Sequence, residues 1–329
     1  MNRDFSLFDA QFARAREGLR VLDELARFLF RDRALYEGLR TLRHRLAAIE
    51  FALGDALTVA GRERGGEPGV DSGALATGTA TIWQVIRSNA GRVTEALRVL
   101  QDVGALYNPG IIHYFQDIRY ELYFLEKELL ERTPQYHLRR LLAQGVVYPI
   151  GASATELAWF IGRGARIVQL RNKEASREQL FSEAKTLLVF IQEFEKRSKE
   201  KVLWILNDYP ELAARLPMAG VHIGQDYPVD KARRILGSLR IIGRSNQSID
   251  QMKASAAAGA DYVSLGPVFS TPHKPDRPAV GLPTVARAAK EIVAPWVAIG
   301  GINKNNFFAV YEAGCRSMAL VRGAKEFFS

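Results

Sequence analysis

Polar and charged residues follow several short apolar runs in the second half of the chain, at the point where each run ends. Gln169, Arg171 and Lys173 alternate after one run, and alternation along an extended chain turns all three to the same side. Asn207 and Asp208 follow the next run. One amide and two cations on one face suit a diphosphate, and Mg²⁺ takes one or two carboxylates with phosphate oxygens and water. We therefore expect a diphosphate site with Asp208 as a metal ligand.

Further residues of the same kind follow three more runs. Asp226 is a candidate second metal ligand, and Ser245 is a candidate substrate ligand. A loop too rich in glycine and proline to be regular carries Thr271, His273 and Lys274. We expect this loop to lie over the mouth of the site, where these three side chains would contact the substrates.

Glycine and arginine follow the last two runs. Gly300 and Gly301 come after the first of them, and Arg322 and Gly323 come after the second. Glycine lets backbone N–H groups approach a phosphate closely. The predicted site thus has cations and a carboxylate on one side and a phosphate-binding loop on the other, so it should hold two phosphorylated ligands at once.

The apolar runs themselves predict the fold of this half. Amphipathic segments separate them, and eight βα units make an α/β protein with a (β/α)8 TIM barrel, whose active site lies beyond the carboxyl ends of the strands. We assign the barrel to residues 146–329. The eight predicted strands are Val146–Ile150, Arg166–Gln169, Val202–Leu206, Gly220–Ile223, Arg240–Gly243, Asp261–Leu265, Trp296–Ile299 and Ser317–Val321.

The end of the chain leaves little room for the eighth helix of such a barrel. Only Ala324 to Ser329 remain for it. We expect either the first half of the chain or a second subunit of a homo-oligomer to cover that part of the barrel wall.

Residues 1–135 have a different pattern, with apolar residues three and four apart, which predicts an all-α domain. This half contains an internal duplication, so we expect two related helical hairpins about a pseudo-twofold axis. Residues 136–145 are expected to be a linker. The residues Arg14, Glu17, Leu19, Arg20, Val21 and Leu22 recur 78 positions later as Arg92, Glu95, Leu97, Arg98, Val99 and Leu100.

Composition narrows the class of protein. The 329 residues carry a formal charge of +9 and a single cysteine, and no apolar run approaches the roughly 18 residues that a membrane helix needs. We expect a soluble, cytoplasmic protein without a disulfide and without a membrane partner. The positive charge favours anionic ligands. Basic residues are not concentrated in one tail or interleaved with aromatic residues along strands, so nucleic acid is a minor alternative.

Residues 146–329 resemble the thiamine phosphate synthase family, also called thiamine-phosphate pyrophosphorylases. The resemblance implies a Mg²⁺-dependent transferase that joins hydroxymethylpyrimidine diphosphate to hydroxyethylthiazole phosphate and releases diphosphate. The matching motifs are Gln169-x-Arg171-x-Lys173, Asn207-Asp208, Gly220-Val221-His222-Ile223-Gly224-Gln225, Gly266-Pro267-Val268-Phe269 with Thr271 and Lys274, Ala279-Val280-Gly281, and Ala298-Ile299-Gly300-Gly301-Ile302.

The resemblance also implies a role for each matching residue. Four residues would bind the diphosphate, namely Arg171, Lys173, Asn207 and Lys274. Asp208 would bind Mg²⁺, Gln169 would lie on the pyrimidine side, and Thr271 with the backbone of Gly300 and Gly301 would bind the thiazole phosphate.

The sequence departs from the family pattern at a few positions. The second metal carboxylate of the family falls on Tyr227, with Asp226 one residue earlier, and Gln247 and Arg322 replace a usual His and Ser. A barrel that binds phosphates of this pathway without turnover therefore stays an alternative. The related thiazole tautomerases share the barrel, but they use the His that is absent at Gln247, so the synthase is favoured.

Two residues and the helical half also have simpler interpretations. Asp208 could cap a following helix, and His222 is more typical of a buried, hydrogen-bonded residue than of a catalyst. The helical half resembles an extension fused to thiamine phosphate synthases in some bacteria, for which a pyrimidine phosphate kinase activity has been proposed, yet it contains no P-loop. Its repeated Arg and Glu residues are typical of solvated pairs within a helix, with an anion site or a subunit interface as the alternatives.

Overall fold

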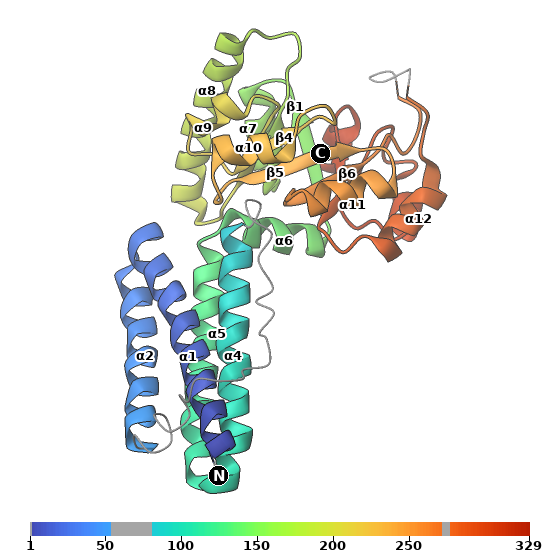
Figure 1. The fold of residues 1–329 in the computed structure, drawn as a ribbon. Coiled ribbons are helices and arrows are strands. Elements are labelled where there is room, and N and C mark those ends of the chain that lie inside the picture. The colour runs from blue at the N-terminus through green and yellow to red at the C-terminus, as the bar shows by residue number, and fades with distance from the viewer. Residues whose placement is uncertain (1, 54–80, 272–276) are drawn as a thin grey trace. The chain divides into compact units, whose positions relative to one another are not determined.

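The computed structural model describes residues 2–53, 81–271 and 277–329, coloured along the chain in Figure 1. The chain divides into two compact units, residues 1–133 and residues 134–329. Within the described residues, no helix has both the length and the apolar character needed to cross a membrane. Each unit is described below by itself.

The first unit is built from long helices, as the helical spacing of apolar residues predicts. Helices α1 and α2 form one hairpin and α4 and α5 form another, and α1 packs on α4 while α2 packs on α5. The leucines of the repeat, among them Leu19 and Leu97, are buried. The elements are α1 (Asn2–Glu24), a π-helical turn η1 (Leu25–Leu29), α2 (Arg33–Leu53), α4 (Ile82–Tyr107), a 3₁₀ turn η2 (Pro109–Ile111) and α5 (Ile112–Glu131).

An ion pair joins the second helices of the two hairpins. Arg45 of α2 pairs with Glu121 of α5.

The repeated arginines of α1 and α4 form exposed pairs within their own helices. Arg20 contacts Glu24 at 3.1 Å, and its counterpart Arg98 contacts Asp102 at 3.2 Å. Exposed pairs of this spacing contribute only about 0.3–0.5 kcal/mol. For these two arginines the simpler interpretation, a solvated intrahelical pair, is the one the structure shows.

The second unit is a closed barrel of eight parallel strands in sequence order, which confirms the predicted fold class. Side chains alternate, so that Ile167 and Gln169 of one strand face the interior while Val168 and Leu170 pack against the surrounding helices. The strands are β1 (Val147–Gly151), β2 (Ile167–Leu170), β3 (Leu203–Asn207), β4 (Gly220–Ile223), β5 (Ile241–Asn246), β6 (Tyr262–Leu265), β7 (Trp296–Ile299) and β8 (Met318–Leu320).

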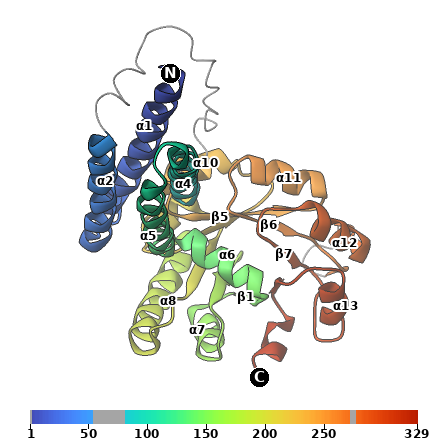
Figure 2. The ribbon, with the colours of Figure 1, turned by 90° about the horizontal axis from the view of Figure 1, so that it is seen from below.

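Helices follow seven of the strands and cover the outer face of the barrel (Figure 2). They are α7 (Ala154–Gly162), α8 (Arg177–Ser198), α9 (Pro210–Ala214), α10 (Val229–Leu236), α11 (Ile249–Ala257), α12 (Gly281–Glu291) and α13 (Phe307–Glu312). The eighth position holds only the 3₁₀ turn η3 (Gly323–Phe327). Phe327 packs on Phe307 and Phe328 packs on Phe160, so two aromatic rings cover part of the wall at this position.

Residues 136–145 were expected to be a linker. All of them but Gly145 lie in helix α6 (Pro134–Gln144), and the whole segment belongs to the barrel unit. Leu138 and Leu142 of α6 pack with Tyr148, Ile150 and other inward residues of the strands. The prediction of a linker was therefore wrong. The end of a barrel that faces away from the site must be sealed from water, and α6 covers that end. Figure 2 looks onto the end that α6 covers.

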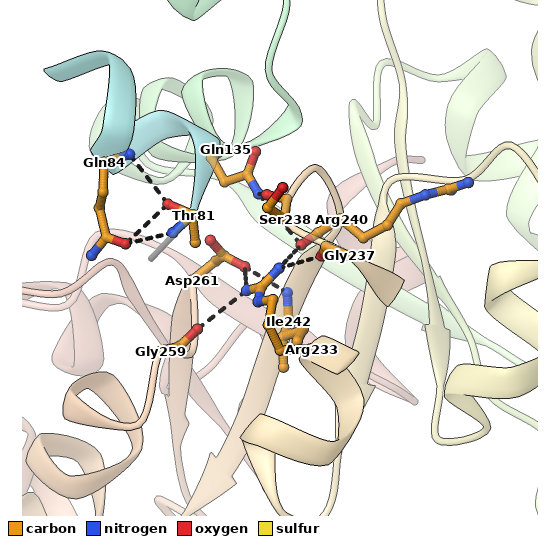
Figure 3. A network of polar contacts seen from close by, with 10 residues as sticks. All are labelled: Thr81, Gln84, Gln135, Arg233, Gly237, Ser238, Arg240, Ile242, Gly259 and Asp261. Carbon is orange, nitrogen blue, oxygen red and sulfur yellow. Dashed lines mark hydrogen bonds and ion pairs between the residues drawn. The ribbon is translucent and has the colours of Figure 1, made fainter. Parts of the chain in front are cut away.

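A buried ion pair joins the amino ends of β5 and β6 (Figure 3). Arg233 of α10 donates to Asp261 at 2.7 Å, and the same carboxylate oxygen accepts the backbone N–H of Ile242 at 2.8 Å. Both side chains are buried, and Arg233 also donates to the backbone oxygens of Gly259 and Arg240. Burial raises the pKa of Asp261, and the charge of Arg233 opposes that shift.

We expect Asp261→Asn to lower the free energy of unfolding by about 3 kcal/mol, because it leaves the Arg233 guanidinium charged and buried without a counter-ion. Urea unfolding followed by tryptophan fluorescence reports on this unit, since Trp159, Trp204 and Trp296 lie in it. Glu291→Gln is the matched control, since it removes exposed pairs with Lys253 and Arg287 and should change the same free energy by less than about 1 kcal/mol. Equal effects of the two variants would contradict a structural role for the buried pair.

Candidate functional site

A cavity of about 470 Å³ opens at the carboxyl ends of the strands. That volume lies within the usual range of sites for small molecules. Its lining includes residues from β1 to β8, so no single segment of the chain builds it. The predicted site residues that line it are Gln169, Arg171, Lys173, Asn207, Asp208, Ser245, Thr271, Gly300, Gly301, Arg322 and Gly323.

One other predicted site residue is not in this lining, and two lie outside the described residues. Asp226 is exposed on the turn after β4, and the neighbouring Tyr227 donates its hydroxyl to Glu211 at 3.2 Å. His273 and Lys274 lie outside the residues that the structure describes. Gln247, which replaces the histidine of the tautomerases, is also absent from the cavity lining.

One side of the cavity carries the cations and the carboxylate. Arg171 follows β2, and its backbone N–H donates to Gly151 of β1 at 2.8 Å, which fixes the direction in which the chain leaves the strand. Partial burial lowers the pKa of the Arg171 guanidinium, and the nearby charge of Asp208 acts in the opposite direction. An arginine keeps its charge under such a shift. Arg171 and Lys173 therefore present two positive charges to a ligand beside Asp208.

The backbone at Asp208 is strained in a way that aims its side chain. Asp208 and Tyr209 have φ angles of 57° and 53°, in the left-handed region that residues other than glycine rarely adopt. The Asp208 N–H donates to His222 at 2.8 Å, and Asn207 donates its side-chain amide to the Asp208 carboxylate at 2.7 Å. Helix α9 has Tyr209 at its N-cap and no side-chain capping bond. Asp208 is thus not a helix cap. Its left-handed backbone conformation instead goes with a side chain that lines the cavity.

The opposite side of the cavity is built from backbone. Gly300 and Gly301 follow β7 with φ angles of 100° and 69°. A Cβ at Gly300 would lie 2.5 Å from Cα of Pro267, and one at Gly301 would lie 2.7 Å from Cβ of Phe269. Only glycine fits both the backbone angle and the space at these positions. Both glycines line the cavity, so this stretch of main chain presents no side chain of its own to a ligand there.

The Asp208 carboxylate fits a magnesium ion bound together with a substrate. Within the described residues there is no group of three His, Cys, Asp or Glu side chains that could hold a metal. Asp208 does line the cavity, next to Asn207 and to the cations that would hold a diphosphate. Mg²⁺ commonly needs just one or two carboxylates, with phosphate oxygens and water as its other ligands. This donor set suits a metal that arrives with the diphosphate.

The floor of the cavity contains residues that the sequence did not point to. Tyr148 of β1 and Tyr262 of β6 are fully buried and join their hydroxyls at 3.2 Å. His222 of β4 contacts the Tyr262 hydroxyl at 2.9 Å, which confirms it as a buried, hydrogen-bonded residue. The only sequence signal for the tyrosines is a phenol at an inward strand position, where its O–H needs a partner.

Arg277 is another cavity residue that the sequence analysis did not identify. It lines the cavity and donates to the side-chain oxygen of Gln225 at 3.3 Å, while Arg244 donates to the backbone oxygen of Gln225 at 2.7 Å. Gln225 thus ties the turn after β4 to strand β5 and to the chain that follows β6. Nothing in the spacing of Arg277 distinguishes it from the many exposed arginines of this basic chain.

Comparisons with known proteins agree with this geometry. Residues 151–324 match the family model described as thiamine monophosphate synthase, and residues 6–128 match the ThiD2 family. The chain is similar to the thiamine-phosphate synthase of a Nostoc species, with 35% identity over 97% of this chain and 88% of that protein. It is also similar to the thiamine-phosphate synthase of Prochlorococcus marinus, with 36% identity over 96% of this chain and 90% of that protein.

Among solved structures, a thiamine phosphate pyrophosphorylase from Pyrococcus furiosus is 26% identical, covers 56% of this chain and 93% of its own, and superposes with a TM-score of 0.49. The family match spans more than half of the chain, and the two relatives align over nearly all of it. The chain therefore belongs to the thiamine monophosphate synthase family, with a unit of the ThiD2 family preceding the barrel.

Proposed function

We propose that the protein is a transferase that forms thiamine phosphate from hydroxymethylpyrimidine diphosphate and hydroxyethylthiazole phosphate. In this reaction the bond between the pyrimidine methylene carbon and the diphosphate oxygen breaks, and a bond from that carbon to the thiazole nitrogen forms. One observation carries the proposal. A single cavity presents two cations and a carboxylate on one side and phosphate-accessible glycine backbone on the other, in a chain of this family.

The chain's own residues would act mainly on the leaving group. Arg171 and Lys173 would neutralise the negative charge that develops on the departing diphosphate, and Asn207 would donate a hydrogen bond to it. Lys274, which the resemblance adds to this set, lies outside the described residues. The pyrimidine stabilises the positive charge left on its methylene carbon, so no covalent nucleophile is required. The protein supplies charge and position instead of a reacting side chain.

Asp208 would hold a magnesium ion against the diphosphate. When bound, Mg²⁺ neutralises charge on the phosphate oxygens of the leaving group. The carboxylate is kept in place by Asn207 and by the strained backbone at its own position. Asp226 stays a candidate for a second contact, although it is exposed and outside the cavity lining.

The thiazole phosphate would bind at the opposite side. The backbone of Gly300 and Gly301 would contact the phosphate of the thiazole substrate. Thr271, Arg322 and Gly323, which line the same cavity, would add further contacts to that phosphate. Binding both substrates in one cavity places the thiazole nitrogen near the carbon that loses diphosphate. The proximity of the two reactants would then supply a large share of the rate enhancement.

We expect Asp208→Asn to lower kcat by about 100-fold at saturating substrates, because it removes the cavity carboxylate whose charge acts on Arg171. Thiamine phosphate formation measured against Mg²⁺ concentration tests this, and the half-saturating concentration should rise. The fold-decrease in kcat caused by Asp226→Asn should be at least about ten times smaller than that caused by Asp208→Asn, since the Asp226 side chain is exposed. A mutant Asp208→Asn with the wild-type Mg²⁺ dependence would contradict the metal assignment.

We expect Gly301→Ala to raise KM for the thiazole phosphate by about tenfold or more and to change KM for the pyrimidine diphosphate by less than about twofold. The new Cβ would lie 2.7 Å from Cβ of Phe269 and 2.9 Å from the backbone oxygen of Ser270. Gly164→Ala is the matched control, because Gly164 also has a positive φ, of 104°, but has open space around it. If both variants shift the two KM values equally, backbone strain and not a phosphate site explains the effect.

A further inference from the structure

A continuous chain of hydrogen bonds crosses the floor of the cavity. Gln169 donates from Nε2 to the Tyr148 hydroxyl at 2.9 Å, and the Tyr148 and Tyr262 hydroxyls lie 3.2 Å apart. His222 contacts the Tyr262 hydroxyl through Nδ1 at 2.9 Å and contacts Ser245 Oγ through Nε2 at 3.0 Å. Five residues from five strands, β1, β2, β4, β5 and β6, are thus linked in one line.

This chain of hydrogen bonds occupies the space that a side chain at position 243 would need. A Cβ at Gly243 of β5 would lie 2.2 Å from the ring of Tyr262 and 2.6 Å from His222 Nδ1. Gln169, Tyr148 and Tyr262 are at most 2% exposed, and His222 is 7% exposed. The line of contacts is therefore packed in place, and its members have little freedom to turn toward other partners.

With a neutral His222, this chain has two orders of its protons in which every contact holds one proton. In the first order, Gln169 donates to Tyr148, each tyrosine donates to the next member, and His222 donates from Nε2 to Ser245. In the second order every bond is reversed, so Ser245 donates to His222 and Tyr148 donates to the Gln169 amide oxygen. A mixed order either leaves a buried donor without a partner or sets two acceptors against each other, and both are costly. The structure has Gln169 Nε2 on Tyr148, which is the amide orientation of the first order.

We propose that Tyr148, Tyr262 and His222 are positioning residues that fix the amide orientation of Gln169 and the hydroxyl of Ser245, and thereby the orientation in which the pyrimidine binds. The first order leaves the Oε1 oxygen and one N–H of Gln169, which lines the cavity, available to a ligand as an acceptor and a donor side by side. This pair complements the amino group and the neighbouring ring nitrogen of an aminopyrimidine. At the other end of the chain, Ser245 keeps its proton to donate to the substrate. This inference rests on the proposed function for the identity of the ligand.

The tautomer of His222 tests the order of the chain in the unaltered protein, without any assay of activity. The first order requires neutral His222 with its proton on Nε2, and the second requires it on Nδ1. Nitrogen-15 NMR of the full chain labelled at its five histidines distinguishes the two, with His222→Gln used to assign the signals. We expect the Nε2-protonated tautomer at pH 7.5. The Nδ1-protonated tautomer, or a doubly protonated ring, would overturn the proposal.

Removing the middle of the chain tests its effect on the substrate. Tyr262→Phe keeps the ring and deletes the oxygen that contacts both Tyr148 and His222. We expect KM for the pyrimidine diphosphate to rise about three- to tenfold, with KM for the thiazole phosphate changed less than about twofold. Tyr311→Phe, at an exposed tyrosine of α13, should leave both values unchanged.

The outcomes separate this inference from the proposed function. A wild-type protein that makes no thiamine phosphate contradicts the function, while the tautomer still tests the chain. An active wild type whose Tyr262→Phe variant keeps its KM for the pyrimidine diphosphate contradicts the chain alone. If Tyr262→Phe does not fold, Tyr148→Phe interrupts the same chain one bond nearer Gln169 and carries the same expected split between the two KM values.

Discussion

Closure of the parallel barrel is the constraint on which the rest of the structure depends. Eight parallel strands that bond in a ring leave no open edge, and they send all their carboxyl ends to one rim. Residues far apart in the sequence, such as Arg171 and Gly301, are thereby brought to opposite sides of one cavity. Neither Arg171 nor Gly301 would form a site without the closed barrel, because each lies in a loop directly after its own strand.

Closure also creates an interior that must be filled at two levels. At the end away from the site, α6 inserts Leu138 and Leu142 against the inward side chains of the strands. Nearer the rim, the inward positions are polar, and Tyr148, Tyr262 and His222 satisfy one another across the barrel. Buried polar groups are tolerated only when their partners are fixed. The same requirement that makes this layer stable also gives it one defined arrangement under the substrate.

Much of the fold and of the site follows from local pattern. The bounds of β4 and β7 are the predicted ones, because a short buried run of apolar residues between turns has few other outcomes. Polar residues just after a strand, such as Arg171 and Asp208, could be assigned to the site for the same reason. The strand β5 extends to Asn246, three residues beyond its predicted end, since Ser245 and Asn246 pair with Ser264 and Leu265 of β6.

What the sequence did not predict depends on contacts between distant segments. Helix α6 was taken for a linker because its leucines find their partners only once the barrel has closed. The role of Phe327 and Phe328 in closing the wall likewise requires Phe307 and Phe160 to be nearby. Tyr148 and Tyr262 look like ordinary core residues until their hydroxyls meet. In each case the missing information is a tertiary partner.

The central claim is that one cavity holds both phosphorylated substrates and couples loss of diphosphate to attack by the thiazole nitrogen. Parallel measurement of diphosphate and thiamine phosphate in the same reaction, with each substrate omitted in turn, tests it most directly. The account predicts equal amounts of the two products and neither product when one substrate is absent. Diphosphate released in the absence of the thiazole phosphate, or in excess of thiamine phosphate, would show hydrolysis without coupling and would contradict it.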